Sequence, residues 1–342
     1  MPQHEVHDAF LKFAHGMLQD PRSRALLLRM AERAGIERRY SPLSVSGPSE
    51  NEVDAYALYR LGSFPATAER MRLFKQFAPA LMRRAVKGLA LSPEERARVR
   101  HVIVTTCTGF YAPGLDFDVV DALELHPGVE RTMLGFMGCY AAINGLKQAR
   151  HLVRSEPDHD VVLVNLELCT LHLQETQDLN KVLSFLIFGD GCAASLITSK
   201  PGGLRMDSFR AVRLEGTADL ITWNIGDQGF DMVLSGQVPA AVGDALRLHR
   251  EELVENETTL WAVHPGGRSV LDAVEQALDL PAAAMEHSRA VLRDHGNMSS
   301  ATVMFVLQSI LRSARAGEHG CAMSFGPGLT AETMRFVAAG VR

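Results

Sequence analysis

His101-Val102-Ile103-Val104-Thr105-Thr106 is an apolar stretch with the length of one buried strand, and it indicates the fold class. Two more stretches of this kind follow, residues 160–165 and residues 191–198. Segments that favour helix alternate with these strands along the chain. This alternation is typical of an α/β protein in which helices cover a buried sheet.

Helical patterns lie on both sides of these strands. Ahead of them, apolar residues recur at helical spacing in 3–18, 23–34 and 67–89, and Ser92-Pro93-Glu94-Glu95 is typical of a capped helix start. A turn at Lys200-Pro201-Gly202-Gly203 interrupts the pattern. Beyond it the sequence predicts helices over 239–255, 270–278 and 301–316, and strands over 259–263 and 321–325. The two parts are alike in plan, which suggests an internal duplication.

The composition excludes several classes of protein. With 342 residues the chain exceeds the usual size of a single core, and its net charge of −5 argues against wholesale nucleic-acid binding. No apolar run has the length of a membrane span, and residues 1–8 do not resemble a signal peptide, so we expect a cytoplasmic protein. The five cysteines are scattered and form no CxxC pair, so we expect them to be reduced, with neither a disulfide framework nor a metal site.

One cysteine stands out in Gly138-Cys139-Tyr140-Ala141-Ala142-Ile143-Asn144-Gly145. A lone cysteine in apolar sequence is more often a packing residue than a nucleophile. Here the glycine permits a tight turn, and residues 141–154 favour a helix. The first turn of a helix has free amides and a positive dipole end, which favour a thiolate and can hold an oxyanion. We therefore expect Cys139 to be a nucleophile.

Two downstream residues are candidate partners of this thiol. His264 ends the apolar strand Leu260-Trp261-Ala262-Val263, where a side chain reaches the edge of a sheet at which ligands collect. Asn297 precedes a predicted helix and is either its N-cap or an amide donor to a substrate carbonyl. Cys139, His264 and Asn297 together outline an acyl-transfer site.

Five motifs occur in an order and spacing that resembles the type III polyketide synthases of the chalcone synthase superfamily, as bacterial members have them. They are Gly138-Cys139, Phe188-Gly189-Asp190-Gly191, Trp261-Ala262-Val263-His264-Pro265-Gly266-Gly267, Gly296-Asn297-Met298-Ser299-Ser300-Ala301 and Ser324-Phe325-Gly326-Pro327-Gly328-Leu329-Thr330. The similarity runs nearly end to end. It implies the α/β thiolase-like fold with αβαβα layers and a homodimer. It also implies two related halves, residues 1–200 with the nucleophilic cysteine and residues 201–342 with the histidine and asparagine.

The resemblance also implies a mechanism that needs only coenzyme A thioesters and no cofactor. Cys139 takes an acyl group from a starter acyl-CoA, and His264 pairs with the thiolate and lowers its pKa. His264 and Asn297 hold the thioester carbonyl of malonyl-CoA during decarboxylation. The resulting enolate attacks the acyl group on Cys139, and after several rounds the chain cyclises.

Further positions match the substrate pocket of the family. Phe188 and Met232 correspond to two residues between the coenzyme A tunnel and the pocket, although Phe230 is an alternative for the second. Arg29 and Arg33 correspond to residues that contact the phosphates of coenzyme A, although charged helix residues are usually solvated. The other matching pocket positions are Thr106, Cys107, Thr108, Glu167, Cys169, Ser299, Gly326 and Pro327.

The product is left open between related alternatives. The motifs around Cys169 and Phe230 resemble bacterial alkylpyrone and alkylresorcinol synthases, which accept fatty acyl starters, and a naphthalene-forming synthase that uses malonyl-CoA alone is the close rival. A ketoacyl-ACP synthase III or HMG-CoA synthase shares the fold but matches these motifs less well. An inactive thiolase-fold partner subunit is the non-enzyme alternative, suggested by Ser324 in place of glycine and by a short start.

Overall fold

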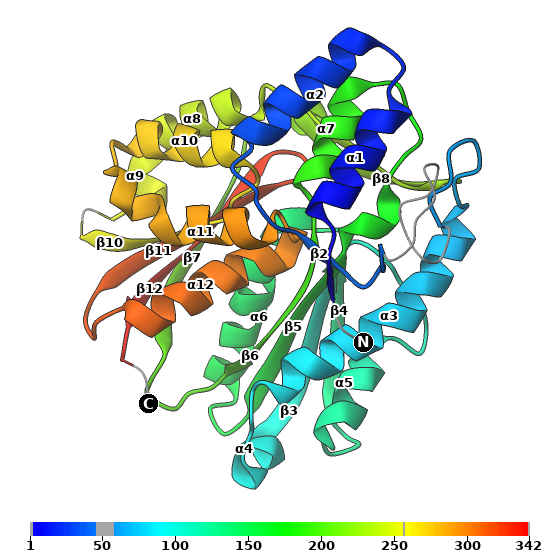
Figure 1. Cartoon of the computed structure of the whole chain (residues 1–342). Coiled ribbons are helices and arrows are strands. Elements are labelled where there is room, and N and C mark those ends of the chain that lie inside the picture. The colour runs from blue at the N-terminus through cyan, green and yellow to red at the C-terminus, as the bar shows by residue number, and fades with distance from the viewer. Residues whose placement is uncertain (1–2, 46–57, 256, 341–342) are drawn as a thin grey trace.

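A computed structural model describes residues 3–45, 58–255 and 257–340. Four strands form a first sheet in the order β4-β3-β5-β6 (Figure 1). Strand β3 pairs in parallel with β4 and β5, and β6 is antiparallel to β5. All residues of β5 are buried, because its run of valines and leucines faces helices on both sides. The strands are β3 (Val99–Thr106), β4 (Glu130–Gly135), β5 (Asp160–Leu168) and β6 (Asp190–Ile197).

A second sheet has the order β10-β11-β12-β7. Its strands are β7 (Leu204–Arg213), β10 (Thr258–Val263), β11 (His319–Gly326) and β12 (Thr330–Ala338). Strands β10 and β11 are parallel, and β12 is antiparallel to both β11 and β7. The series β3-β5-β6 of the first sheet thus has the same directions as β10-β11-β12 of the second.

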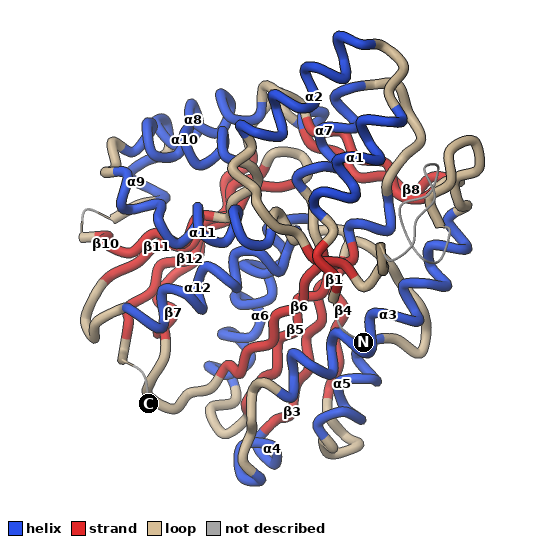
Figure 2. The backbone as a smooth tube through the Cα atoms, viewed as in Figure 1, coloured by secondary structure: helices blue, strands red, loops and turns tan. Residues whose placement is uncertain are grey.

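The helices complete five layers (Figure 2). Helices α3 (Thr67–Lys87) and α5 (Leu115–Leu123) pack on the outer face of the first sheet. Helices α6 (Ala141–Ser155) and α12 (Thr302–Ser313) lie between the two sheets, and α8 (Val238–Leu248) and α10 (Arg268–Leu278) cover the outer face of the second sheet. The predicted layered α/β fold is confirmed.

Helix α6 illustrates how the sequence specifies the central layer. Its buried residues Ala142, Leu146, Ala149 and Val153 recur at helical spacing on one face. Gly145 lets the helix approach β5 closely, since a Cβ at this position would lie 2.7 Å from Leu163 Cδ1. Small residues in the first two turns therefore bring α6 and the turn that precedes it against the sheet.

Most of the other expected elements are present with shifted ends. The helix expected over 3–18 begins only at α1 (His7–Met17), because β1 (His4–Glu5) pairs with β2 (Tyr40–Ser41). The capping box at Ser92 and Glu95 is present, and the helix expected over 239–255 divides at His249 into α8 and α9. The remaining elements are α2 (Pro21–Arg33), α4 (Pro93–Arg98), α7 (Leu179–Ile187), α9 (Arg250–Leu253), α11 (Glu286–His295), β8 (Ile221–Gly226) and β9 (Gly229–Leu234).

Two observations concern expected absences. All five cysteines are free, as the sequence predicted. In the part of the chain that the structure describes, no helix has both the length and the apolar character needed to cross a membrane.

Candidate active site

Two adjoining cavities meet at Cys139. The outer cleft holds about 2510 Å³ of empty space, part of it open to solvent, and His264, Asn297 and Arg33 are among the residues that line it. The inner chamber is smaller, with about 700 Å³ of empty space that also includes open solvent, and it is lined by residues that include Cys107, Cys169 and Ser299. The residues common to both walls are Cys139, Ser184, Phe188, Ile221 and Met232. The expected Cys/His/Asn set is thus brought into one connected space.

A tight turn places Cys139 at the start of the central helix. The residue lies in a 3₁₀ turn, η1 (Gly138–Tyr140), between β4 and α6. Gly138 has φ +70°, and a Cβ there would lie 2.2 Å from Pro327 Cδ. Its N–H donates to Cys107 Sγ at 3.0 Å. Glycine is therefore required on both conformational and steric grounds.

The Cys139 thiol is held in its neutral form in this structure. Burial raises its pKa to about 12, and hydrogen bonds with Ser299 and Asn297 offset only part of this rise. Cys139 Sγ lies 3.9 Å from Ser299 Oγ. Burial therefore opposes the thiolate that the helix start was expected to favour.

His264 follows β10 and projects into the outer cleft. Its backbone N–H donates to Met323 O of β11 at 2.8 Å, which fixes the residue at the end of the second sheet. The side chain is buried, and neither ring nitrogen has a hydrogen-bond partner among the described residues. Burial lowers the pKa of His264 to about 3, so the imidazole is neutral. A standing ion pair with Cys139, which the sequence predicted, is absent from these contacts.

Asn297 is fixed by hydrogen bonds on both sides. Its Oδ1 accepts from Ser299 N at 2.8 Å, and its Nδ2 donates to Gly266 O at 3.3 Å. The backbone forms a bridge to Phe188, with Asn297 N donating to Ile187 O at 2.8 Å. The Oδ1 contact makes Asn297 a local cap for the turn η5 (Ser299–Ala301), while the amide group faces the outer cleft. Capping and presentation of an amide donor are therefore compatible here.

A buried carboxylate lies behind the inner chamber. Glu167 Oε2 accepts from Cys107 N and from Thr108 Oγ1, both at 2.9 Å, and Oε1 accepts from Ser300 Oγ at 2.6 Å. Burial raises the pKa of Glu167 to about 7, against the lowering effect of these hydrogen bonds. Cys107, Thr108 and Glu167 thus form one network, in which only the first two line the chamber.

The boundary between cavities is formed by Phe188 and Met232. Phe188 ends α7 and Met232 lies on β9, and each lines both cavities. Phe230 instead stacks on His172 with ring centroids 4.3 Å apart and lines neither cavity. Of the two alternatives for the second boundary residue, the structure therefore places Met232 at the boundary.

Of the remaining residues expected in the pocket or at coenzyme A, some line the two cavities and others do not. Pro327 lines the inner chamber and Gly326 the outer cleft, on the loop between β11 and β12. Thr106 is buried behind the chamber wall and lines neither cavity. Arg33 lines the outer cleft, whereas Arg29 is exposed on α2 outside the lining.

Several chamber residues have no sequence signal that would have identified them. His172 is fixed by hydrogen bonds, its Nε2 lying 2.7 Å from Thr108 O and its Nδ1 accepting from Phe230 N at 3.1 Å. Lys181 of α7 pairs with Asp231 of β9 at 2.8 Å across the chamber wall. Their assembly depends on the pairing of distant segments, which a local pattern does not reveal.

Comparison with known proteins identifies the family. The family model for the N-terminal domain of chalcone and stilbene synthases matches residues 1–201, and the model for the C-terminal domain matches residues 209–339. Two curated relatives are an alpha-pyrone synthesis polyketide synthase-like protein of Mycobacterium tuberculosis and a 1,3,6,8-tetrahydroxynaphthalene synthase of Streptomyces peucetius. The first is 32% identical over 93% of this chain and 83% of its own. The second is 31% identical over 92% of this chain and 84% of its own.

Solved structures agree with this assignment. The crystal structure of 1,3,6,8-tetrahydroxynaphthalene synthase from Streptomyces coelicolor, a bacterial type III polyketide synthase, matches with a TM-score of 0.84 and 25% identity over 100% of this chain and 97% of that one. A polyketide synthase of the brown alga Ectocarpus siliculosus matches with a TM-score of 0.82 and 28% identity over 98% of this chain and 95% of that one. The chain therefore belongs to the chalcone and stilbene synthase family and is a type III polyketide synthase of the bacterial type, an acyltransferase with the thiolase-like fold.

Proposed function

We propose that Cys139 carries the growing polyketide between the outer cleft and the inner chamber. The observation that supports this role is that Cys139, Phe188 and Met232 belong to the walls of both cavities. A coenzyme A thioester entering through the outer cleft meets the thiol at the boundary, and an acyl group on that thiol can extend into the chamber. The chain enters the chamber while coenzyme A stays outside.

Loading begins with proton removal from the thiol. In the free enzyme burial lowers the pKa of His264 and raises the pKa of the Cys139 thiol, so proton transfer from the thiol to the imidazole requires that substrate binding bring these two pKa values together. The sulfur attacks the thioester carbonyl of the starter acyl-CoA, the carbon–sulfur bond to coenzyme A breaks, and the proton passes to the leaving thiolate. Thiol and imidazole thus form the reactive ion pair only as the substrate arrives.

Decarboxylation uses the two donors in the outer cleft. Asn297 Nδ2 and a protonated nitrogen of His264 bind the thioester oxygen of malonyl-CoA. Loss of CO₂ leaves an enolate whose negative oxygen these donors stabilise. The enolate carbon then attacks the acyl carbonyl on Cys139, the thioester bond breaks, and the chain grows by two carbons. The fixed Oδ1 of Asn297 supports this role, because its contact with Ser299 N holds the amide in one orientation.

The proposed product is an alkylpyrone or alkylresorcinol built on a fatty acyl starter. Phe185, Ile221 and Met232 provide an apolar wall for an alkyl chain in the inner chamber. A naphthalene-forming reaction from malonyl-CoA alone is the second candidate, supported by the tetrahydroxynaphthalene synthase among the relatives.

Incubation with malonyl-CoA and a ladder of acyl-CoA starters tests this proposal. We expect pyrone or resorcinol products whose masses increase with the length of the starter. Products from malonyl-CoA alone, unchanged by any starter, would establish the naphthalene alternative. A reaction with malonyl-ACP but not with malonyl-CoA would instead indicate a ketoacyl-ACP synthase, and no decarboxylation of either substrate would indicate an inactive partner subunit.

We further propose that Arg33 and Arg29 bind the phosphates of coenzyme A. Arg33 supports this role best, because it lines the outer cleft next to Met30 and Ala34 of the same region. Arg33→Ala should raise KM for acyl-CoA with little change in kcat, since the contact binds ground state and transition state alike. Arg29→Ala is the matched comparison, and we expect a smaller effect because its side chain lies outside the cleft lining.

The enzyme is proposed to work as a cytoplasmic homodimer without a cofactor. Strand β4 supports the dimer, because it ends the first sheet and exposes 37% of Met133. Light scattering on the purified protein should give twice the monomer mass. A monomer mass for the active enzyme would contradict this part of the proposal.

A further inference from the structure

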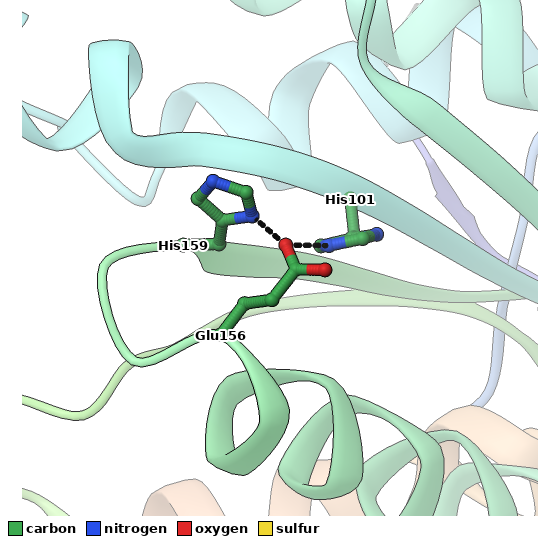
Figure 3. Close-up of side chains that lie close together, drawn as sticks. All are labelled: His101, Glu156 and His159. Carbon is green, nitrogen blue, oxygen red and sulfur yellow. Dashed lines mark ion pairs between the residues drawn. The ribbon is translucent and has the colours of Figure 1, made fainter.

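Two histidines and a glutamate meet at the end of the first sheet away from Cys139. His101 lies near the start of β3, Glu156 follows the last residue of α6, and His159 precedes β5. Figure 3 shows the Glu156 carboxylate between the two imidazole rings. One ligand atom of each residue lies within 4.8 Å of the others. The cluster therefore joins a strand, a helix end and a turn.

The imidazole nitrogens that face Glu156 lack hydrogen bonds. His101 is only 5% exposed, and its Nε2 has no hydrogen-bond partner among the described residues. The same holds for His159 Nδ1. His101 Nε2 lies 3.8 Å from Glu156 Oε2, and His159 Nδ1 contacts the same oxygen more closely. Buried His101 Nε2 therefore carries the free-energy cost of a missing hydrogen bond, which a bound cation would remove, whereas His159 Nδ1 already pairs with Glu156.

Glu130 orients the His101 ring. The two residues are directly opposite each other in the β3–β4 pairing, and Glu130 Oε2 lies 3.4 Å from His101 Nδ1. A ring proton on Nδ1, facing this carboxylate, would leave the lone pair of Nε2 free to bind a cation. Metal-binding histidines are commonly oriented by such a carboxylate.

The turn that carries the other two residues is held in place. His159 N donates to Glu156 O at 2.9 Å, which closes the turn. Pro157 O accepts from Arg98 Nη2 at 3.2 Å and from Ser199 Oγ at 2.6 Å. Glu156 and His159 therefore have a defined backbone arrangement before any ligand binds.

We propose that His101 Nε2, His159 Nδ1 and Glu156 Oε2 bind a divalent transition metal such as Zn²⁺, which clips the α6–β5 turn to β3. Two imidazoles and one carboxylate suit this class of ion. Zinc bonds of about 2.0–2.2 Å place neighbouring ligand atoms roughly 3.3 Å apart, so the exposed Glu156 carboxylate would move away from His159 and toward His101 when the ion binds. The sequence had predicted no metal, because these ligands come from separate elements and include no cysteine.

Calorimetric titration of the full chain with Zn²⁺ tests this site. We expect one equivalent to bind and to raise Tm. His159→Ala should weaken binding by more than the about 10- to 100-fold expected for Glu130→Gln, which removes only the orienting carboxylate. Both His159 and Glu130 reach the surface, so these variants avoid the buried position of His101. His151→Ala is the matched control, since His151 is exposed on α6 outside the cluster and its loss should leave affinity unchanged.

Substitution with Co²⁺ distinguishes this site from the cysteines. We expect visible d–d absorption without a thiolate-to-metal charge-transfer band. A stoichiometric site with strong thiolate bands, equal affinity in His159→Ala and wild type, or no binding of Zn²⁺ would each overturn the proposal. Polyketide synthase activity is not needed for any of these readouts.

Discussion

The turns that precede the two central helices, α6 and α12, have similar backbone conformations but present different functional groups. Helix α6 begins after the turn Gly138–Tyr140 and leads into β5, and α12 begins after the turn Ser299–Ala301 and leads into β11. Each turn has a residue with positive φ, Gly138 at +70° and Ser299 at +47°. The first turn presents the Cys139 thiol, and the second positions the Asn297 amide through a hydrogen bond to Ser299 N.

The same kind of turn before a central helix presents a thiol in one case and an amide in the other. In both halves the chain turns sharply at the edge of a sheet, so that a side chain reaches the cavity while a helix starts behind it. Glycine adopts the positive φ at the first turn without strain, whereas Ser299 retains a strained positive φ at the second, as is common at functional sites. The proposed division of labour is that the first half holds the acyl group and the second half holds the enolate.

Removal of the Cys139 thiol in the first turn should have the largest effect on activity. Cys139→Ala should abolish product formation, because it removes the thiol that is the proposed acyl carrier, while the small side chain keeps the fold. Product assays and circular dichroism measure both effects. Cys169→Ala is the matched control in the inner chamber and should retain turnover. Full turnover in Cys139→Ala would refute the role of the thiol.

Loss of His264 should affect both halves of the reaction. His264→Ala should slow acyl loading and malonyl-CoA decarboxylation together, because the neutral imidazole is the proposed base for one and donor for the other. Each contribution is worth about 10²-fold or more. Stopped assays of acyl-enzyme and of released CO₂ measure the two steps separately. If both rates stay at the wild-type level, the role of His264 is misassigned.

Loss of Asn297 should slow malonyl-CoA decarboxylation much more than acyl loading on Cys139. Asn297→Ala should lower decarboxylation by about 10²- to 10³-fold, because one donor to the developing enolate is removed. Acyl loading on Cys139 should remain measurable, since the thiol and His264 are intact. Comparison of the CO₂ release rate with the acyl-enzyme yield checks this. Equal losses in both steps would mean that Asn297 serves the fold or the thiol instead.

A methyl group in the first turn should cost stability. Gly138→Ala combines a positive φ with a clash against Pro327, and we expect a loss of more than about 2 kcal/mol in the free energy of unfolding. Gly328→Ala is the matched control, because it has φ +71° but nothing within 4 Å of the added Cβ. Chemical denaturation of both variants measures the difference. Equal losses would show that φ alone, without the clash, accounts for the glycine.

A further prediction concerns the pH dependence of stability. The pKa of Glu167 is raised from 4.5 to about 7 in the folded protein, so the folded state binds more protons than the unfolded state between these values. The contribution of Glu167 to stability should therefore fall as pH rises from 4.5 to 7, by at most about 1.4 kcal/mol per pH unit. Glu167→Gln should flatten the slope in urea denaturation, because its amide can donate to Ser300 and its oxygen can accept from Cys107 N.

A second carboxyl group limits how flat that slope becomes. The pKa of Asp190 is also raised to about 7 by burial, and it contributes with the same sign. Asp190→Asn in the same experiment separates the two contributions. An unchanged slope in Glu167→Gln would show that Glu167 is ionised in the folded protein throughout this range.

Sequence reasoning predicted the elements with continuous apolar runs and missed those with polar residues. Strands β3, β5 and β10 were expected because each contains a continuous apolar run. Strand β12 was not, because Glu332 and Thr333 interrupt its pattern, although both are buried in the sheet. Strand β7 was missed for a similar reason, since its arginines alternate with apolar residues at the edge of the second sheet.

At the candidate site, too, local sequence patterns predicted some features and not others. The motifs around Cys139, His264 and Asn297 indicated the proposed reacting groups, and all three residues line the outer cleft. The pKa of the thiol could not be predicted from its place in the sequence, because burial by distant segments opposes the local effect of the helix start. The choice between Phe230 and Met232 also depended on which face of β9 meets the chamber.

Location of the acyl group on the protein tests the central claim most directly. The wild-type enzyme would be incubated with an acyl-CoA starter in the absence of malonyl-CoA, digested, and analysed by mass spectrometry. The account predicts one acyl group, on the peptide that contains Cys139, and none on Cys107 or Cys169 of the same chamber. An acyl group on either of those residues, or no acyl-enzyme at all, would contradict it.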